Sequence, residues 1–104
     1  MTINVHKLSL EEIKVGTDVL CIRPHPRDGW ITHGRLYNIN YVNKTLSVFG
    51  VSDDDNDPTD YCIYEMEDIF SDDFCYYSVS GIPEEELFFI KLGGVTDYDI
   101  IVDN

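Results

Sequence analysis

The stretch RLYNINYVNKTLSVFGV, residues 35–51, decides the kind of fold that this chain adopts. In its first half, Tyr37, Ile39 and Tyr41 lie on one face of an extended chain and their neighbours lie on the other, which is typical of a half-buried strand. The Asn-Lys pair that follows suits a two-residue turn, and residues 45–51 alternate again. The stretch therefore predicts an antiparallel hairpin.

Further short strands are expected on both sides of this hairpin. Residues 18–23 alternate in the same way, and two similar pentapeptides, DYCIY and DFCYY, place Cys62 and Cys75 at equivalent positions of two strands. Two prolines and an Asp-Gly pair make residues 24–30 a loop. The tail, residues 95–102, alternates only in part, so it predicts a sixth strand less clearly than the other segments predict theirs. The predicted strands are residues 18–23, 35–42, 45–51, 60–64, 73–77 and 95–102.

Two segments have the signals of helices. Ser9 and Glu12 have the spacing of a capping box, which predicts one or two helical turns after residue 8. Residues 82–94 have Pro83 in the first turn, three glutamates behind it, Lys91 near the end and two glycines as a stop. This second segment is the better helix of the two.

The composition fits one compact domain. The chain has 104 residues, of which 43% are hydrophobic, so it can form a small core. We expect a single domain over residues 1–104, with its core in about 14–80 and a C-terminal helix and tail in 81–104. Val19, Leu36, Leu46 and Val48 are expected to be largely buried in that core. The fold class is therefore predicted to be mainly β.

The cysteines and the N-terminus indicate a cytoplasmic protein. Cys21, Cys62 and Cys75 are odd in number and show no CxxC spacing, so the sequence predicts neither a disulfide framework nor a zinc knuckle. The first ten residues contain no apolar signal region, and no run approaches the ~20 apolar residues that cross a bilayer.

Charge is distributed very unevenly along the chain. The formal net charge is −13. Residues 1–44 contain six basic and four acidic side chains, whereas residues 45–104 contain sixteen acidic side chains and Lys91 as their only basic one. Such asymmetry indicates an electrostatic interaction, although a solvated acidic surface remains an alternative. An acidic chain does not bind nucleic acid by neutralising phosphates.

The acidity is concentrated in residues 51–73, which contain ten carboxylates and neither lysine nor arginine. A calcium loop that starts at Asp53 would have Pro58 at the position of the usual glycine and Tyr64 at that of the bidentate glutamate. Calcium binding is therefore not expected. A zinc site is not expected either, because Cys21, His25, His33 and Cys62 do not match the spacing of known zinc ligand sets.

Trp30 has two interpretations. Tryptophan is enriched at interface hot spots, so Trp30 is a candidate anchor for a partner. The alternative, which we favour at this point, is that Trp30 closes one end of a small barrel core. Together with Arg23, His25 and Arg27 it also resembles a basic loop that contacts nucleic acid, but the acidic half of the chain opposes that role.

Residues 14–51 contain two short motifs: Val15 and Gly16 precede the first predicted strand of this stretch, and Thr32, Gly34 and Tyr37 form a TxGxxY segment that opens the second. In these motifs the stretch resembles the small SH3-like barrels of bacteriophage proteins. The resemblance implies an SH3-like barrel of five or six short strands with a short C-terminal helix, and a viral origin. It does not imply a shared activity. The sequence departs from the pattern after Val51.

The sequence therefore predicts an acidic protein-interaction module. We expect it to occupy a basic or nucleic-acid-binding surface of a host protein and so to inhibit that protein, with mimicry of DNA by the acidic face left open, and not to be an enzyme. The alternative is an accessory or structural viral protein whose acidity serves solubility. No cofactor, metal, membrane or direct nucleic-acid contact is expected. The candidate partner-binding residues are Trp30, Asp53, Asp54, Asp55, Asp57, Asp60, Glu65, Glu67, Asp68, Asp72 and Asp73.

Overall fold

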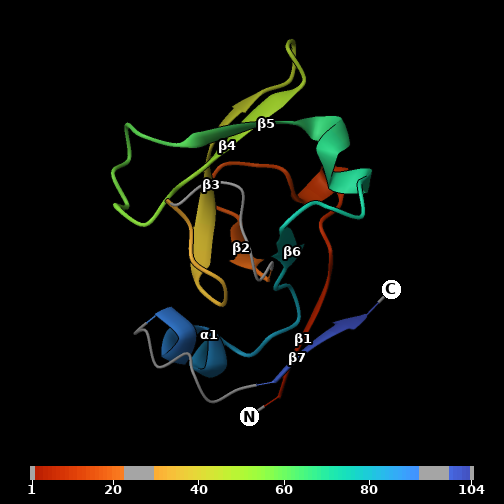
Figure 1. Cartoon of the computed structure of the whole chain (residues 1–104), viewed down its shortest axis with the longest axis vertical. Helices are drawn as coiled ribbons and strands as arrows, with labels where there is room; N and C mark the ends of the chain where they lie inside the picture. The colour runs from red at the N-terminus through yellow and green to blue at the C-terminus, as the bar shows by residue number, and fades with distance from the viewer. Residues whose placement is uncertain (1, 23–29, 92–98, 104) are drawn as a thin grey trace.

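The structure is a computed structural model of the chain, and residues 2–22, 30–91 and 99–103 are described (Figure 1). These residues form a mainly β structure with one α-helix, α1 (Glu84–Lys91), and two short 3-10 helices, η1 (Leu10–Glu12) and η2 (Met66–Phe70). The strands are β1 (Thr2–Lys7), β2 (Asp18–Cys21), β3 (Leu36–Asn43), β4 (Val48–Val51), β5 (Cys62–Glu65), β6 (Tyr76–Ser78) and β7 (Asp99–Asp103).

The strands pair into one mixed sheet in the order β5-β4-β3-β2-β6-β1-β7. Neighbouring strands are antiparallel except β1 and β7, which run parallel from the pair Thr2 and Asp99 to the pair His6 and Asp103. The prediction of a mainly β fold with a short helix is confirmed. The expected barrel of five or six strands is not seen, because the described strands number seven and pair as an open sheet with β5 and β7 at its edges.

The sheet bends at β3. The first residues of β3 pair with β2, as in the pair of Val19 with Tyr37. The later residues pair with β4, and the register shifts between Ile39 and Tyr41. An extra residue in one strand makes an antiparallel pair bend and twist more strongly. As a result, β4 and β5 lie across the upper part of the molecule in Figure 1, and one face of the sheet is enclosed by the bend.

The enclosed face holds the larger core cluster. It combines Val19 and Cys21 of β2 with Phe49 and Val51 of β4, and Ile69 of η2 closes one side. Within it the aromatic rings of Phe49, Tyr64, Phe74 and Tyr76 meet at centroid separations between 5.5 and 6.2 Å. These separations are those of favourable aromatic pairs, so the cluster gains more than its buried area alone.

The opposite face of the sheet is covered by α1. Successive residues of a strand point to opposite faces, so Leu20 of β2 points away from the first cluster. It packs in a second cluster with Ile3, Val5, Val79 and Ile90. Ile90 is 2% exposed and fixes the helix to the sheet. The helix is shorter than the predicted 82–94, and residues 92–94 of that prediction lie outside the described residues.

The main differences from the predicted elements are at the ends of strands. The hairpin turn covers residues 44–47, not the predicted Asn43 and Lys44, so β4 begins at Val48. Leu46 is therefore 68% exposed in the turn, and its predicted burial is wrong. Leu36 and Val48 are half-buried, and Val19 is fully buried as predicted. β1 was not predicted. The predicted loop 24–30 lies outside the described residues except for Trp30.

Candidate interaction surface

The ten carboxylates of residues 53–73 lie at both ends of β5. Five belong to the loop of residues 52–61, here called the acidic loop, which joins β4 to β5, and the others belong to the end of β5, to η2 and to the turn behind it. Figure 1 shows this loop and η2 at opposite ends of the edge strand β5. The acidic segment of the sequence thus follows one edge of the sheet, with its carboxylates at either end of β5.

Asp53 and Asp54, the first two of these carboxylates, turn toward the protein. Asp53 is only 7% exposed, and its Oδ1 accepts a hydrogen bond from the backbone N–H of Asp55 at 3.0 Å. This contact closes a short turn at the start of the loop. Neither Asp53 nor Asp54 belongs to the open acidic surface that the sequence predicted.

Asp54 is the centre of a hydrogen-bond network. Its carboxylate accepts from Thr32 Oγ1 at 2.8 Å, from Arg35 Nη1 at 3.1 Å and from the Tyr37 hydroxyl at 2.5 Å. The Tyr37 hydroxyl in turn accepts from the backbone N–H of Thr32 at 2.6 Å. Burial and the hydrogen bond to Asp54 raise the pKa of Tyr37 well above its ordinary value. The network joins the acidic loop to residues 32–37.

The remaining carboxylates are mostly exposed. Asp55, Asp57, Asp60, Glu65, Glu67, Asp72 and Asp73 are exposed, whereas Asp68 is half-buried. Asp68 Oδ2 accepts from the backbone N–H of Glu65 at 3.0 Å, and Lys7 forms an ion pair with Asp72 at 3.2 Å. The predicted residues therefore divide into a structural group and an exposed group.

Two of the exposed carboxylates differ in their ionisation. The backbone N–H and hydroxyl of Thr59 donate to Asp57 Oδ1 at 2.9 and 2.7 Å and hold the pKa of Asp57 below its ordinary value. A hydrogen bond with Glu67, together with the negative charges of Glu67 and Asp68, raises the pKa of Glu65. Like charges are thus crowded at the end of β5, at the surface of the protein.

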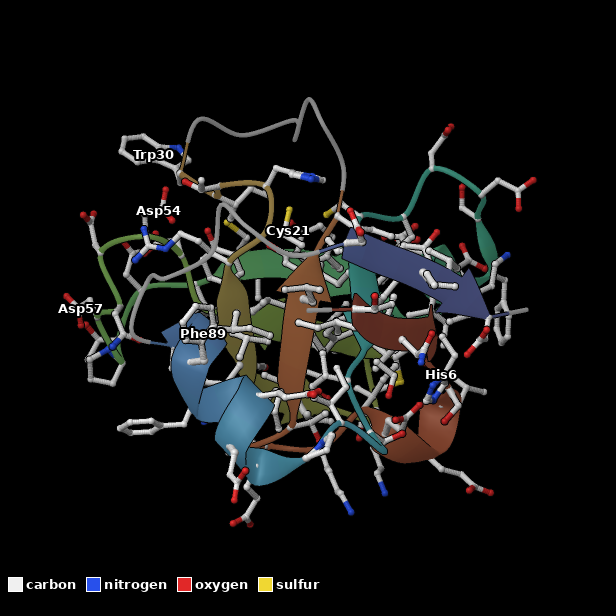
Figure 2. The ribbon with its side chains drawn as sticks, turned by 90° about the horizontal axis from the view of Figure 1, so that it is seen from below. His6, Cys21, Trp30, Asp54, Asp57 and Phe89 are labelled. Atoms are coloured by element: carbon white, nitrogen blue, oxygen red, sulfur yellow. The ribbon has the colours of Figure 1, made fainter. Side chains whose placement is uncertain are left out.

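Trp30 is 61% exposed, so the interpretation that it closes a core is wrong. Its backbone carbonyl accepts from the N–H of Asp54 at 2.7 Å, which places it beside the acidic loop. Figure 2 shows Trp30, Asp54, Asp57 and Phe89 on one side of the molecule, with His6 on the other. Phe89 is 43% exposed on α1. Two exposed aromatic side chains therefore lie on the same side as the acidic loop.

A polar cleft of about 370 Å³ lies between the start of β3, the acidic loop and the end of α1. Ion pairs link residues of its lining: Arg35 with Asp54 at 3.1 Å, and Lys91 with Asp18 at 3.1 Å. This cleft could not be predicted from the sequence, because its lining residues are separated by up to 73 positions, from Asp18 to Lys91. Nothing local in the sequence relates them.

A second polar cluster joins β1, η1 and β6. Ser78 donates to Glu12, and Ser80 Oγ lies 3.2 Å from His6 Nε2. Glu12 Oε1 lies 3.8 Å from the same ring nitrogen of His6. In a catalytic relay the serine and the carboxylate face different nitrogens of the histidine. This cluster therefore stabilises the fold and is not arranged for nucleophilic catalysis.

The contacts of this cluster shift the pKa of Glu12. Partial burial alone would raise the pKa of Glu12, but hydrogen bonds from Ser78 and Ser9 and the nearby His6 together lower it below its ordinary value. The backbone N–H of Ser9 donates to Glu12 Oε1 at 3.0 Å, which confirms the predicted capping box.

The described residues show neither a metal-binding cluster nor a membrane-spanning helix. Within residues 2–22, 30–91 and 99–103, no three His, Cys, Asp or Glu side chains are grouped so that they could hold a metal ion. His25, one of the zinc candidates considered above, lies outside these ranges. In the same described ranges, no helix has the length and apolar character needed to cross a membrane.

Comparisons with protein-family models, with curated proteins and with solved structures found no match for this chain.

Proposed function

We propose that this protein is an acidic interaction module that binds, and thereby inhibits, a basic surface of another protein. The binding surface is the acidic edge, which we define as Asp55, Asp57, Asp60, Glu65, Glu67, Asp72 and Asp73 around β5. The partner is a cytoplasmic host protein whose basic surface normally binds nucleic acid. In this proposal the chain is of bacteriophage origin.

The crowding of exposed carboxylates at the end of β5 carries the proposal. Glu65, Glu67 and Asp68 lie close enough for the pKa of Glu65 to rise, although its side chain faces solvent. Solubility of a small domain needs a net charge of magnitude about 2–8, and this chain has −13. A partner that brings cations to this edge would relieve the repulsion, and it would associate fast and with strong salt dependence.

A second candidate function follows from the place of β5 in the sheet. Edge strands expose unpaired backbone groups, and charged side chains beside them prevent pairing with other chains. The carboxylates around β5 would then only keep the protein monomeric and soluble. This candidate corresponds to the accessory or structural protein that the sequence leaves as an alternative.

The relation to SH3-like proteins remains part of the proposal. Gly16 and Gly34 of the two matching motifs have φ angles of 98° and 83°, in the left-handed region that favours glycine. Gly16 precedes β2 and Gly34 precedes β3, so both bends occur where the family pattern has them. These bends support a common ancestry for residues 14–51.

Affinity capture from a lysate of the host cell tests the proposal. The acidic-edge variant combines Asp55→Asn, Asp57→Asn, Asp60→Asn and Glu67→Gln. The matched control combines Glu84→Gln, Glu85→Gln, Asp99→Asn and Asp103→Asn, which removes the same charge from exposed residues elsewhere. Capture is compared at about 50 and 500 mM salt, where screening differs strongly, and with duplex DNA as competitor.

We expect the parent and the control to retain a basic protein at low salt, to release it at high salt and to lose it to duplex DNA. The acidic-edge variant should not retain it. Equal capture by both variants would show that the acidity serves only solubility. If duplex DNA does not displace the captured protein, the bound surface of that protein is not its nucleic-acid-binding surface.

A further inference from the structure

We propose that the polar cleft between β3, the acidic loop and α1 binds the guanidinium group of an arginine side chain that the basic partner presents. The inference rests on the proposed function, and it names the chemical group that the partner inserts. It concerns a different set of residues from the acidic edge, so the two can be tested separately.

Asp53 is the first reason for this assignment. It lines the cleft and is 7% exposed, and its only hydrogen bond within the described residues uses Oδ1, which accepts from Asp55. Its Oδ2 accepts no hydrogen bond there and is reached by solvent, because Asn40 Oδ1 is the only fully buried side-chain oxygen or nitrogen without a partner among those residues. Asp18 is similar, because its contact with Lys91 uses Oδ2 and leaves Oδ1 available. Two carboxylate oxygens on the cleft can accept further hydrogen bonds.

Two amides of the lining are available as well. The side chains of Asn38 and Asn56 make no hydrogen bond within the part of the chain that the structure describes. The backbone of Asn56 is fixed in the left-handed region, with φ at 53°, by a hydrogen bond from its N–H to the carbonyl of Asp53 at 3.0 Å. The lining thus offers two carbonyl oxygens in addition to the carboxylates.

These acceptors suit a guanidinium group better than an anion or an ammonium group. Three carboxylates line the cleft, Asp18, Asp53 and Asp54, against two cations, Arg35 and Lys91. An anion would meet this net negative charge. A guanidinium group has five N–H donors in a planar fork, which can reach several acceptors at once, whereas an ammonium group has three donors on one point charge.

The walls and the rim suit the rest of an arginine side chain. Leu36 and Ile90 contribute apolar surface to the lining, against which the methylene stem can pack. The volume of about 370 Å³ is within the range of ligand-binding clefts. Trp30 and Phe89, both exposed, lie on this side of the molecule in Figure 2 and can contact the flanking residues of the partner.

A titration with blocked tripeptides tests this inference. The full chain is titrated with acetyl-Gly-Arg-Gly-amide, followed by NMR of the side-chain amides of Asn38 and Asn56. Two comparison peptides replace the arginine with lysine or with citrulline. Citrulline has the shape of arginine without its charge. The arginine peptide should shift both amides saturably, the lysine peptide should bind several-fold more weakly, and the citrulline peptide should leave them unchanged.

Asp53→Asn is the matched variant, because its amide oxygen can still accept from Asp55 while the charge is lost. Its control is Asp60→Asn, which removes one charge from an exposed site outside the cleft. Asp53→Asn should weaken the arginine peptide about tenfold, the loss expected for one charge-assisted contact, and Asp60→Asn should not. Should Asp53→Asn not fold, Asn56→Gly, which keeps the left-handed backbone, takes its place.

Equal binding of the arginine and lysine peptides, or no shift of Asn38 and Asn56, would overturn the inference. The outcome is separate from that of the capture experiment. If the peptide does not bind but the acidic-edge variant still loses its partner, the cleft is excluded and the proposed function stands. If the peptide binds in the cleft while both charge variants capture equally, the acidic edge is excluded and the cleft stands.

Discussion

Asp54 has more interactions than any other residue of the acidic loop. Its carboxylate receives three side-chain donors from residues 32–37, and its side chain is 28% exposed. We expect Asp54→Asn to lower the free energy of unfolding by about 1.5–3 kcal/mol, the usual loss for hydrogen bonds to a charged group. Urea unfolding at neutral pH measures this difference.

The neighbouring Asp55→Asn is the control, because Asp55 is exposed and such substitutions usually change stability by less than about 0.5 kcal/mol. From the sequence alone, neutralising Asp53, Asp54, Asp55 and Asp57 together would be expected to leave the fold intact. The structure changes that expectation for Asp53 and Asp54. Equal stability of the Asp54 and Asp55 variants would show that the network contributes little.

Glu12 should make stability depend on pH. Its pKa in the folded protein lies below the ordinary value of 4.5, so the ionised form is favoured by folding. The resulting stability is fully present above about pH 4.5 and is lost as the pH falls through the lower folded pKa. We expect Glu12→Gln to be less stable than the parent at pH 7, with a difference that shrinks as the pH falls below 4.5 in urea unfolding.

Glu65 should behave in the opposite way. Glu67 and Asp68 raise its pKa, so its charge opposes folding at neutral pH, and protonation relieves this as the pH falls. Glu65→Gln should therefore be slightly more stable than the parent at pH 7, and this advantage should disappear on acidification. A Glu65→Gln variant that is less stable than the parent at pH 7 would contradict the crowding.

At the scale of elements, Gly50 sets how closely β4 meets the acidic loop. A Cβ atom at this position would lie 2.4 Å from Cδ2 of Tyr61, whose ring packs on Tyr41 with a centroid separation of 5.3 Å. We expect Gly50→Ala to displace the Tyr61 ring and to cost about 1–3 kcal/mol in the free energy of unfolding, as overpacking usually does. Chemical denaturation of the variant measures this cost.

A double-mutant cycle identifies the cause. In a Tyr61→Ala background the added methyl group has space, so Gly50→Ala should cost much less there than in the parent. If the cost is the same in both backgrounds, it comes from the backbone of β4 and not from the ring.

Elements with a repeated pattern could be predicted from the sequence, and their ends could not. β2 and β3 alternate over their length, and their positions were predicted to within two residues at each end. β1 was missed because only Ile3 and Val5 alternate in it, which is too short a signal. Leu46 follows the alternation of β4 but lies in the turn, since Asn43 Oδ1 accepts from the N–H of Leu46 at 3.0 Å and extends the turn.

The site was predictable only where it depends on local charge. The sequence indicates that residues 53–73 are acidic and exposed, which applies to seven of the ten carboxylates. It does not indicate that Asp54 binds Thr32 and Arg35, because these residues are 22 and 19 positions away. The cleft depends on four separate segments, from β2, β3, the acidic loop and α1, so only the tertiary structure shows it.

For the whole molecule, the net charge of −13 predicts a stabilising effect of salt. Repulsion among exposed carboxylates disfavours the compact state, and the screening length falls from about 30 Å at 10 mM salt to about 8 Å at 150 mM. We expect Tm to rise by several degrees over this range, measured by thermal unfolding in NaCl, because about 1 kcal/mol shifts the Tm of a domain of this size by roughly 4–8 °C.

The acidic-edge variant provides the comparison. With four of the crowded charges removed, its Tm should be higher than that of the parent at low salt and should rise less on addition of NaCl. If Tm falls with salt in the parent, attractive ion pairs such as Lys7 with Asp72 outweigh the repulsion.

The parallel pairing of β1 with β7 sets the order in which the chain can fold during its synthesis. β1 is made first, yet both its neighbours come late: β6 at Tyr76–Ser78 and β7 at Asp99–Asp103. Contacts between residues so far apart in sequence slow folding, because a long loop must close before they form. During synthesis, Ile3 and Val5 therefore remain an unpaired apolar segment until β7 has left the ribosome. A chaperone that binds short apolar segments would bind them during that interval.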